Sequence, residues 1–333
     1  MIRSLAVDGP NKPLKPMEFD PGVLPDNQVE IEVQYCGVCH SDLSMMDNEW
    51  GASRYPLVPG HEVVGKVVKT GSMVRSLQAG DSVGLGWHSD YCEQCTYCHS
   101  GEHNLCSASQ PTIIGRHGGF ADRVRASETA VVPLPPGIDL KSAGPLFCGG
   151  ITVYNPIVQF QIKPTDKVAV IGIGGLGHLA LQFLSAWGCD VTAFSSNPDK
   201  AEQAKALGAS HILDSTDIKQ LDSARDKFDF IICTVNVELN WTGYLNTLAP
   251  KGRLHFVGVI PTPIAISVGS MLGKQLQISA SPVGSPATIS EMLNFAVRHD
   301  IKPMVEVFPF DQANAAIEKL RAGRVRYRAV LEL

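Results

Sequence analysis

A strand, a glycine-rich turn and a helix that follow one another directly constrain this sequence most. Residues 167–171 (KVAVI) predict a buried strand, and residues 178–187 (HLALQFLSAW) predict an amphipathic helix. The turn between them fits the pattern G-x-G-x-x-G, and the positions expected at a pyrophosphate are Gly172, Gly174, Gly175, Leu176 and Gly177. The pattern is weak alone, but between a strand and a helix the glycines permit a tight turn and the helix N-terminus attracts phosphate. The segment therefore predicts a dinucleotide-binding domain.

The rest of the sequence predicts two kinds of domain. Short apolar strands at 191–194, 228–233 and 253–257 are separated by helix-length segments, which indicates a doubly wound parallel sheet. Before residue 145, β-branched runs such as 29–33 and 63–68 alternate with period two between turn signals, which indicates a β-rich, barrel-like domain. The fold class is therefore α/β. We expect a first domain at 1–149, a cofactor domain at 150–286, and a return of 287–333 to the first domain.

Composition and charge narrow the function. The 333 residues are 44% hydrophobic and 18% charged, as in ordinary globular proteins, and the formal net charge is −5. This charge gives no electrostatic footprint for nucleic acid, so we expect no nucleic-acid partner. The N-terminus lacks the apolar region of a signal peptide, and no run of 18 apolar residues occurs. We therefore expect no membrane association and a cytoplasmic location.

Nine cysteines are many for a reducing compartment, so their clusters favour metal ligands over disulfides. Four of them have the spacing C-x2-C-x2-C-x7-C in one loop, namely Cys92, Cys95, Cys98 and Cys106. Four thiolates with no open coordination position suit a structural zinc. An iron–sulfur cluster and reactive thiols without a metal are the alternatives.

The end of the second strand of the parallel sheet bears on the cofactor. An NAD-selective site presents an acidic residue there to the ribose 2′-hydroxyl. This chain instead has Ser195 and Ser196, followed by Lys200, whose hydroxyl and ammonium groups suit a 2′-phosphate. We therefore expect NADP(H) to be preferred over NAD(H), although Asp199 lies a few residues beyond the strand.

Three short motifs carry a family resemblance. They are CGVCHSD at 36–42, GHE at 60–62 and CGGIT at 148–152. With them, the sequence resembles the zinc-containing medium-chain alcohol dehydrogenase family, in particular its cinnamyl-alcohol-dehydrogenase-like aldehyde reductase branch, over essentially the whole chain. The resemblance implies a GroES-like catalytic domain, a Rossmann cofactor domain and a homodimer.

The resemblance also implies a catalytic zinc site. Its ligands would be Cys39, His61 and Cys148, which leave one position for water or substrate oxygen. Glu62 would lie beside the metal and approach it when the bound water leaves. Asp42 would orient the ring of His61.

Other roles are implied around this site. Ser41 matches the hydroxyl residue that begins the family's proton relay, but Ser44 stands where a histidine commonly ends it. His40 is either a cofactor contact or an exposed polar residue. Trp50 matches a position that lines the substrate cleft, and Trp87 is a weaker candidate; together they favour apolar or aromatic substrates. The further cofactor contacts implied by the family are Thr152, Val257, Gly258, Ser279, Ser281 and Arg328.

We therefore expect two zinc ions per chain and a reaction that interconverts aldehydes and primary alcohols. Zinc would polarise the carbonyl oxygen, and NADPH would deliver hydride to the carbon. Two alternatives remain: a binding or scaffold protein that keeps the fold without catalysis, and an NAD-dependent polyol dehydrogenase. An intact ligand set disfavours the first, and the absence of an acid at Ser195 disfavours the second.

Overall fold

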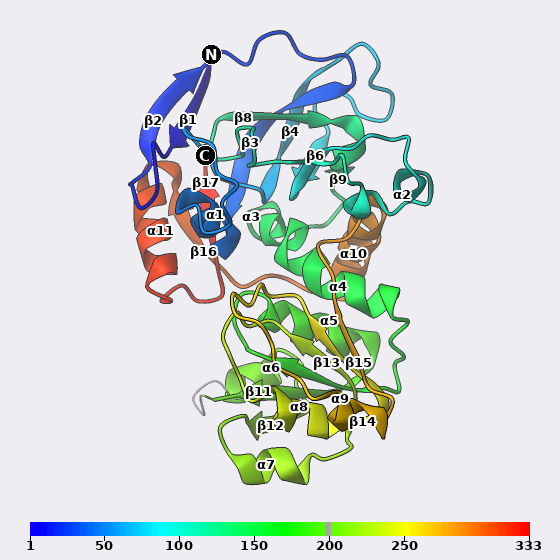
Figure 1. Ribbon diagram of the computed structural model, residues 1–333. Coiled ribbons are helices and arrows are strands. Elements are labelled where there is room, and N and C mark those ends of the chain that lie inside the picture. The colour runs from blue at the N-terminus through cyan, green and yellow to red at the C-terminus, as the bar shows by residue number, and fades with distance from the viewer. Residues whose placement is uncertain (197–200) are drawn as a thin grey trace. The chain divides into compact units, whose positions relative to one another are not determined.

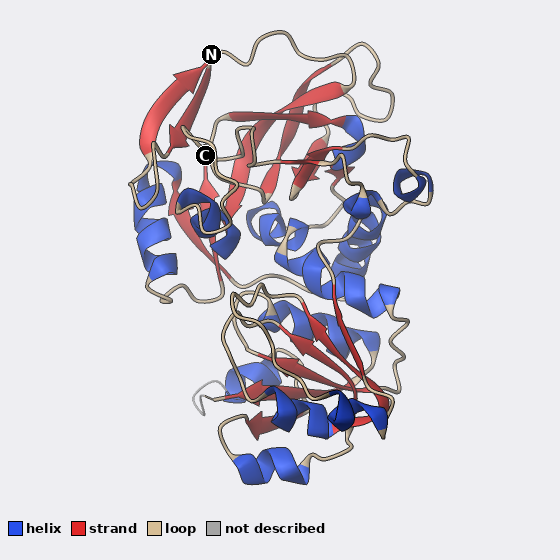
Figure 2. Ribbon diagram, in the orientation of Figure 1, coloured by secondary structure: helices blue, strands red, loops and turns tan. Residues whose placement is uncertain are grey.

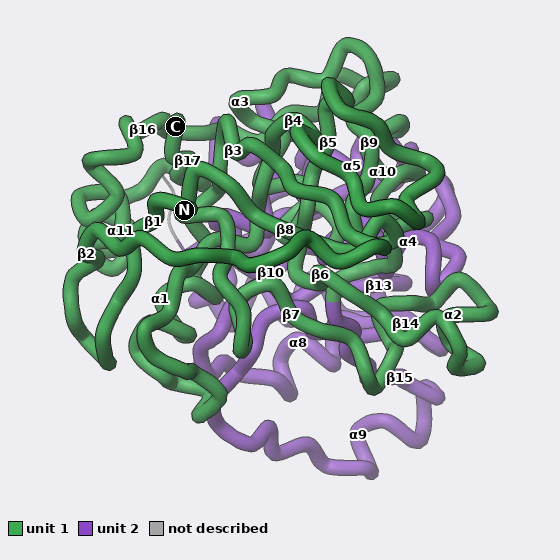
Figure 3. The backbone as a smooth tube through the Cα atoms, turned by 90° about the horizontal axis from the view of Figure 1, so that it is seen from above, with its two compact units in different colours: residues 1–151, 283–333 green, residues 152–282 purple. Residues whose placement is uncertain are grey.

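The computed structural model describes residues 1–196 and 201–333 and divides into two compact units. Unit 1 comprises residues Met1–Ile151 and Val283–Leu333, and unit 2 comprises residues Thr152–Pro282 (Figure 3). One helix, α4 (Gly149–Gln159), contains the point at which the chain passes from the first unit to the second.

Unit 1 is built on a mostly antiparallel sheet with the strand order β16-β17-β3-β4-β5-β9, in which β8 also pairs with β3. These strands are β3 (Gln28–Val38), β4 (Val63–Thr70), β5 (Ser82–Leu85), β8 (Arg123–Ser127), β9 (Val131–Pro133), β16 (Val305–Pro309) and β17 (Arg328–Glu332). Two smaller antiparallel pairs are β1 (Ile2–Ala6) with β2 (Lys15–Phe19), and β6 (His88–Asp90) with β7 (Gln110–Pro111). The α-helices are α1 (His40–Met46), α2 (Thr96–His99), α3 (Leu140–Ala143), α10 (Pro286–Arg298) and α11 (Ala313–Arg321).

The long strand β3 organises this unit because three other strands pair with it. Its alternating Val29, Ile31 and Val33 are buried in the core. The antiparallel partner β17 aligns Ala329 with Val38, which brings the C-terminal segment beside the first cysteine motif (Figure 1). Residues about 290 positions apart in sequence thus meet in one sheet.

Unit 2 has the predicted parallel sheet, and the α/β fold class is confirmed. The strand order β12-β11-β10-β13-β14-β15 runs through β10 (Lys167–Ile171), β11 (Asp190–Ser195), β12 (His211–Asp214), β13 (Phe228–Cys233), β14 (Leu248–Phe256) and β15 (Gln277–Ala280). Helices cover both faces of this sheet (Figure 2), namely α5 (Gly177–Trp187), α6 (Ala201–Ala206), α7 (Ile218–Ser223), α8 (Trp241–Thr247) and α9 (Val268–Leu272). Because both faces are covered, the central strand β10 is a continuous apolar run.

None of the described helices combines the length and the apolar character that a membrane span requires.

A buried carboxylate ties β3 to β8. Glu30 accepts hydrogen bonds from Arg125 Nε at 2.7 Å and from Arg123 Nη1 at 3.0 Å. Burial raises the pKa of Glu30, but the hydrogen bonds and charges of the two arginines outweigh this effect and lower it. The folded-state pKa is therefore below the unfolded-state value. The ion pair stabilises the fold above the unfolded-state pKa, and this contribution is lost as the pH falls through the folded-state pKa.

We predict that Glu30→Gln lowers the melting temperature at pH 7 by a few degrees, because loss of a hydrogen-bonded buried charge costs about 1–3 kcal/mol. The difference between wild type and variant should shrink as the pH falls below the ordinary glutamate pKa toward the lowered folded-state pKa of Glu30, where the wild-type carboxylate also protonates. Differential scanning calorimetry at several pH values measures both effects. Glu18→Gln, at an exposed position of β2, is the matched control. An equal difference at all pH values would contradict the account.

Candidate functional site

The first cysteine motif places its residues at the start of α1. Cys39 is the residue before the helix, and Asp42 reaches back so that its Oδ2 accepts the Cys39 N–H at 2.9 Å. This contact satisfies a backbone donor that a helix start leaves free. Oδ1 of Asp42 accepts the Gly60 N–H at 2.9 Å and lies 3.0 Å from His61 Nδ1. One buried carboxylate thus holds the 36–42 and 60–62 motifs together.

Cys39, His61 and Cys148 converge in unit 1. The Sγ atoms of Cys39 and Cys148 are 3.8 Å apart, and His61 Nε2 lies 3.3 Å from the Cys148 Sγ. A tetrahedral zinc with Zn–S near 2.3 Å and Zn–N near 2.0 Å separates its ligand atoms by about 3.8 Å for S···S and about 3.5 Å for S···N. The donor atoms therefore fit a zinc ion. Because a carboxylate only accepts, His61 Nδ1 donates to Asp42, which leaves Nε2 free as a ligand.

The electrostatics of these groups favour an anionic ligand. The neighbouring Cys148 thiol lowers the pKa of Cys39 well below its ordinary value, against the effect of burial. A deprotonated cysteine is the form that binds a metal.

Glu62 lies in the same cluster, and its ligand oxygen is within 4.8 Å of the other donor atoms. Burial raises the pKa of Glu62 to about 7, although the charge of Arg328 opposes this. Its Oε1 pairs with the Arg328 guanidinium. Its Oε2 has no hydrogen-bond partner in the part of the chain that the structure describes. A side chain on Gly37 would lie 1.9 Å from this Oε2, so only glycine leaves room for the carboxylate.

Arg328 is expected at a pyrophosphate from the family resemblance. The structure buries it at the start of β17, where it pairs with Glu62. Its Nε has no partner among the described residues.

Two tryptophans lie beside the donor set. The Trp87 ring makes an edge contact with the His61 ring at 5.0 Å between centroids. Trp50 in turn contacts Trp87 edge-on at 5.9 Å, and 39% of Trp50 is exposed. An aromatic surface therefore runs from a candidate metal ligand to the solvent.

The remaining residues predicted near this site lie on two helices. His40 opens α1 and is exposed, Ser41 follows it half-buried, and Ser44 is buried one turn later. Thr152 is buried in α4.

The four-cysteine loop forms a second donor cluster. Sγ distances are 3.5 Å for Cys106 and Cys92, 3.6 Å for Cys95 and Cys98, and 3.9 Å for Cys92 and Cys98. These match the edge of about 3.8 Å expected for a ZnS4 tetrahedron. Backbone N–H groups of Gln94 and Cys95 lower the pKa of Cys92 to about 6, which favours its thiolate. The residues that the structure describes therefore include two candidate zinc sites.

In unit 2, the backbone of the glycine-rich turn packs tightly against itself. Gly172 has φ +88°, and a side chain on Gly177 would lie 1.9 Å from the Gly172 carbonyl oxygen. A Cβ on Gly174 would meet no described atom within 4 Å, so this side of the turn is open in front of α5. An open glycine backbone before a helix N-terminus fits a phosphate group.

The other residues predicted to bind the cofactor in unit 2 follow the carboxyl ends of neighbouring parallel strands. Ser195 ends β11 and Ser196 follows it exposed, and Lys200 lies outside the described residues. Val257 and Gly258 follow β14, where a Cβ on Gly258 would lie 2.5 Å from the Val235 carbonyl oxygen. Ligands of open parallel sheets bind at such carboxyl ends.

The hydroxyl groups of Ser279 and Ser281 are engaged within unit 2. They lie 2.9 and 3.0 Å from the two ring nitrogens of His255. Burial lowers the pKa of His255 to about 4, so its ring is neutral and donates one hydrogen bond while accepting the other. The serine that donates to the ring keeps its oxygen free to accept a further hydrogen bond, and the serine that accepts keeps its hydrogen free to donate.

Sequence reasoning missed two residues that support these sites. Thr234 follows β13, and its Oγ1 lies 2.8 Å from the Gly172 carbonyl oxygen and 3.0 Å from that of Ile171, so its one hydroxyl hydrogen is shared between these two acceptors. Its position at the end of the apolar run 228–233 was the available signal. Gly37 belongs to the motif at 36–42, but nothing in the sequence indicated that it leaves room for Glu62.

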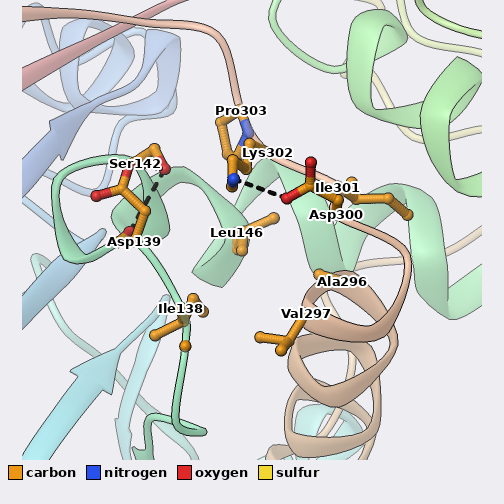
Figure 4. Close-up of a pocket in the computed structure, with 11 residues that line it drawn as sticks. Ile138, Asp139, Ser142, Leu146, Ala296, Val297, Asp300, Ile301, Lys302 and Pro303 are labelled. Atoms are coloured by element: carbon orange, nitrogen blue, oxygen red, sulfur yellow. Dashed lines mark hydrogen bonds and ion pairs between the residues drawn. The ribbon is translucent and has the colours of Figure 1, made fainter.

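A separate cavity in unit 1 is too small to be a substrate site. It lies between the segment around Asp139 and Ser142 and the end of α10 (Figure 4), and an ion pair of Lys302 with Asp300 at 2.7 Å borders it. Its volume of about 30 Å³ holds no more than about two water molecules.

Comparison with known proteins agrees with this geometry. Residues 25–136 match the family model "Alcohol dehydrogenase GroES-like domain", and residues 175–298 match "Zinc-binding dehydrogenase". The chain is 61% identical over 331 residues to an aldehyde reductase, AdhA, of Synechocystis sp., covering 99% of this chain and 98% of that protein.

Two solved structures also resemble the chain over nearly its whole length. A cinnamyl alcohol dehydrogenase of Sorghum bicolor superposes with a TM-score of 0.95 at 37% identity, covering 99% of this chain and 97% of that one. A CAD from Helicobacter pylori, complexed with NADP(H), superposes with a TM-score of 0.91 at 28% identity, with the same coverage of 99% and 97%.

Replacement of Cys98 by alanine tests the four-cysteine site. We predict that zinc content falls from about two to about one per chain. The melting temperature should fall by at least about 5 °C, because binding energy at a structural metal is folding energy. Metal analysis and calorimetry check the two values. Cys189→Ala, at a buried cysteine outside both clusters, should retain both ions. A Cys98→Ala protein with unchanged metal content would refute the assignment.

Proposed function

This chain belongs to the zinc-containing medium-chain alcohol dehydrogenase family, and we propose that it reduces aldehydes to primary alcohols with NADPH. The observation that carries the proposal is the convergence of Cys39, His61 and Cys148 at metal-ligand distances beside an aromatic surface. Three protein ligands leave a coordination position open, which is what a catalytic zinc site requires.

Each residue around the donor set has a separate role in the proposed reaction. Cys39, His61 and Cys148 would hold a zinc ion, which would serve as a Lewis acid for the carbonyl oxygen. Asp42 fixes the orientation of His61 and the start of α1. Arg328 balances the charge of Glu62, so this carboxylate remains close to the donor set as a further possible ligand.

Trp50 and Trp87 favour apolar and aromatic aldehydes. Their rings offer apolar contact area next to His61, but only the indole N–H of each can hydrogen-bond. A polyol would leave hydroxyl groups without partners against such a surface, at a cost of a few kcal/mol.

The end of β11 supports a preference for NADP(H). NADPH supplies the hydride, and Ser195, Ser196 and Lys200 would bind its 2′-phosphate. An acid does follow in the neighbouring strand, where Asp214 is the register partner of Ser195. However, its Oδ1 accepts hydrogen bonds from both the N–H and the hydroxyl of Thr216, so this oxygen is already engaged.

None of the nine cysteines forms a disulfide, which fits a reducing compartment, and we place the protein in the cytoplasm on that ground.

The dimer implied by the family would form at β15. This strand is the last in the order of the parallel sheet, and 37% of its Ile278 is exposed. Val268 and Leu272 on α9 and Val259 after β14 are also exposed. An unpaired strand with apolar neighbours is a template for pairing with another chain, and a twofold axis would pair two copies antiparallel.

We predict that the protein is a dimer and that Ile278→Lys shifts it toward the monomer, because a buried, unpaired ammonium opposes the interface. Light scattering after size-exclusion chromatography measures the mass. Val297→Lys is a matched control, since Val297 of α10 is 36% exposed and lies in the other unit. A dimer mass unaffected by Ile278→Lys would rule out this interface.

The central test measures the oxidation of NADPH and NADH with benzaldehyde, hexanal and a sugar aldehyde, with zinc quantified in the same preparation. We predict a higher kcat/KM with NADPH and with the two apolar aldehydes, at about two zinc ions per chain. Cys148→Ala should lower kcat/KM at least about 10³-fold with little change in fold, because it removes a ligand of the Lewis acid.

A strong preference for NADH, or for the sugar aldehyde, would contradict the proposal, as would turnover retained in Cys148→Ala. Cys189→Ala serves again as the control for loss of a buried thiol.

A further inference from the structure

Thr112 lies where the four-cysteine loop returns to the rest of unit 1. The loop begins after Trp87 with β6 and ends with β7, and these two strands pair His88 with Pro111. Thr112 continues this pairing by one residue, because its N–H donates to the Trp87 carbonyl oxygen at 2.8 Å. Thr112 is only 1% exposed. The two ends of the loop are therefore joined at the residue whose ring contacts His61.

The side chain of Thr112 holds the peptide unit in front of Trp87. Its Oγ1 donates to the Gly86 carbonyl oxygen at 2.7 Å, and this contact is buried. The Gly86 carbonyl belongs to the planar peptide unit that includes the Trp87 N–H, so this hydrogen bond fixes the plane from which the Trp87 residue continues. Together, the N–H and the hydroxyl of Thr112 hold the carbonyl groups before and after the Trp87 Cα atom.

Gly86 requires this external contact because of its place in the fold. A Cβ on Gly86 would lie 2.6 Å from the Phe147 carbonyl oxygen, so only glycine fits against the segment that leads into Cys148. Glycine also has the widest choice of backbone angles. The missing side chain that lets the chain after β5 approach Phe147 therefore leaves the direction of Trp87 unrestricted, and the Thr112 hydroxyl restricts it.

The position of the Trp87 ring bears on which substrates bind well. The ring contacts the His61 ring at 5.0 Å and the Trp50 ring at 5.9 Å between centroids. Trp50 is anchored separately, on the turn after α1, where Asn48 Oδ1 accepts the Ser53 N–H at 3.0 Å. The energy of an aromatic pair depends on the distance and tilt of its rings. A displaced Trp87 ring is therefore a poorer partner for an aromatic substrate and matters little to a substrate without a ring.

We propose that Thr112 is a positioning residue that sets the preference for aromatic over small aldehydes by fixing the Trp87 ring beside His61. The inference rests on the proposed function, in which Trp50 and Trp87 form the substrate surface. Thr112 acts through the Gly86–Trp87 peptide unit and takes no part in the hydride transfer, so its loss changes the binding of a ring and leaves the chemical step alone. Its backbone N–H is present whatever the side chain, so the hydroxyl is the part that a substitution removes.

The test measures kcat and KM for the reduction of benzaldehyde and acetaldehyde with NADPH in wild type, Thr112→Val, Thr112→Ser, Trp87→Ala and the double variant of Thr112→Val with Trp87→Ala. Thr112→Val keeps the side-chain shape without the hydroxyl and should raise the KM of benzaldehyde about 3- to 10-fold, the range of an aromatic pair energy. The KM of acetaldehyde and both kcat values should change less than about twofold, because acetaldehyde has no ring. Thr112→Ser should behave as wild type, because it keeps the donor.

The double variant should match Trp87→Ala, because two changes that act through the same side chain do not add. Thr247→Val is the matched control. Thr247 is 0% exposed and lies in unit 2, where its Oγ1 donates to the Tyr244 carbonyl oxygen at 2.7 Å. This variant loses an equally buried hydroxyl and should leave both KM values unchanged. If Thr112→Val does not fold, Thr112→Ala removes the same hydroxyl, and the same result is expected of it.

The inference is wrong if folded Thr112→Val keeps the wild-type ratio of the two KM values, or if Thr112→Ser raises the KM of benzaldehyde as much as Thr112→Val does. It is also wrong if Thr112→Val adds its full effect to that of Trp87→Ala, because Thr112 would then not act through Trp87. A zinc-loaded wild type that turns over no aldehyde with either nicotinamide cofactor would instead overturn the proposed function and this inference with it.

Discussion

The Asp42 carboxylate is the contact on which the candidate site depends. It is fully buried, and its two oxygens meet the Cys39 N–H, the Gly60 N–H and His61 Nδ1. These partners belong to two segments about 20 residues apart, so a single side chain sets the start of α1, the turn at Gly60 and the ring orientation of one ligand. A buried carboxylate is costly unless its oxygens are paired. The three hydrogen bonds offset that cost and make the arrangement specific.

A second layer of constraint comes from steric exclusion. Glu62 occupies its position because Gly37 has no side chain, and the turn at Gly60 has φ +101°, where a Cβ would strike Phe120. The glycines of the two motifs thus leave space that the Glu62 carboxylate fills beside Gly37 and that Phe120 fills beside Gly60. Arg328 then supplies the charge that a buried Glu62 requires.

The parts of the molecule that sequence reasoning predicted are those set by short-range patterns. The strand, turn and helix at 167–187 and the spacing of the four cysteines involve neighbours in the chain, and spacing alone limits their geometry. Cys39, His61 and Cys148 could be grouped only through a family resemblance, because no local pattern joins residues 109 positions apart. The contact of Arg328 with Glu62 was not predicted, since it follows from the pairing of β17 with β3.

The same pairing of β17 with β3 has a consequence for how the protein is made. Glu62 and Arg328 are 266 positions apart, and all of unit 2 is synthesised between them. While a ribosome is still adding unit 2, the Glu62 side chain has no cation to meet and β3 has an open edge where β17 will pair. Domains generally fold as units in order of synthesis, so unit 2 can become compact before unit 1 is closed. Formation of the Glu62–Arg328 pair is therefore a late, long-range event, although Cys39, His61 and Cys148 are all synthesised before unit 2. The four-cysteine loop, by contrast, lies within 15 residues of sequence.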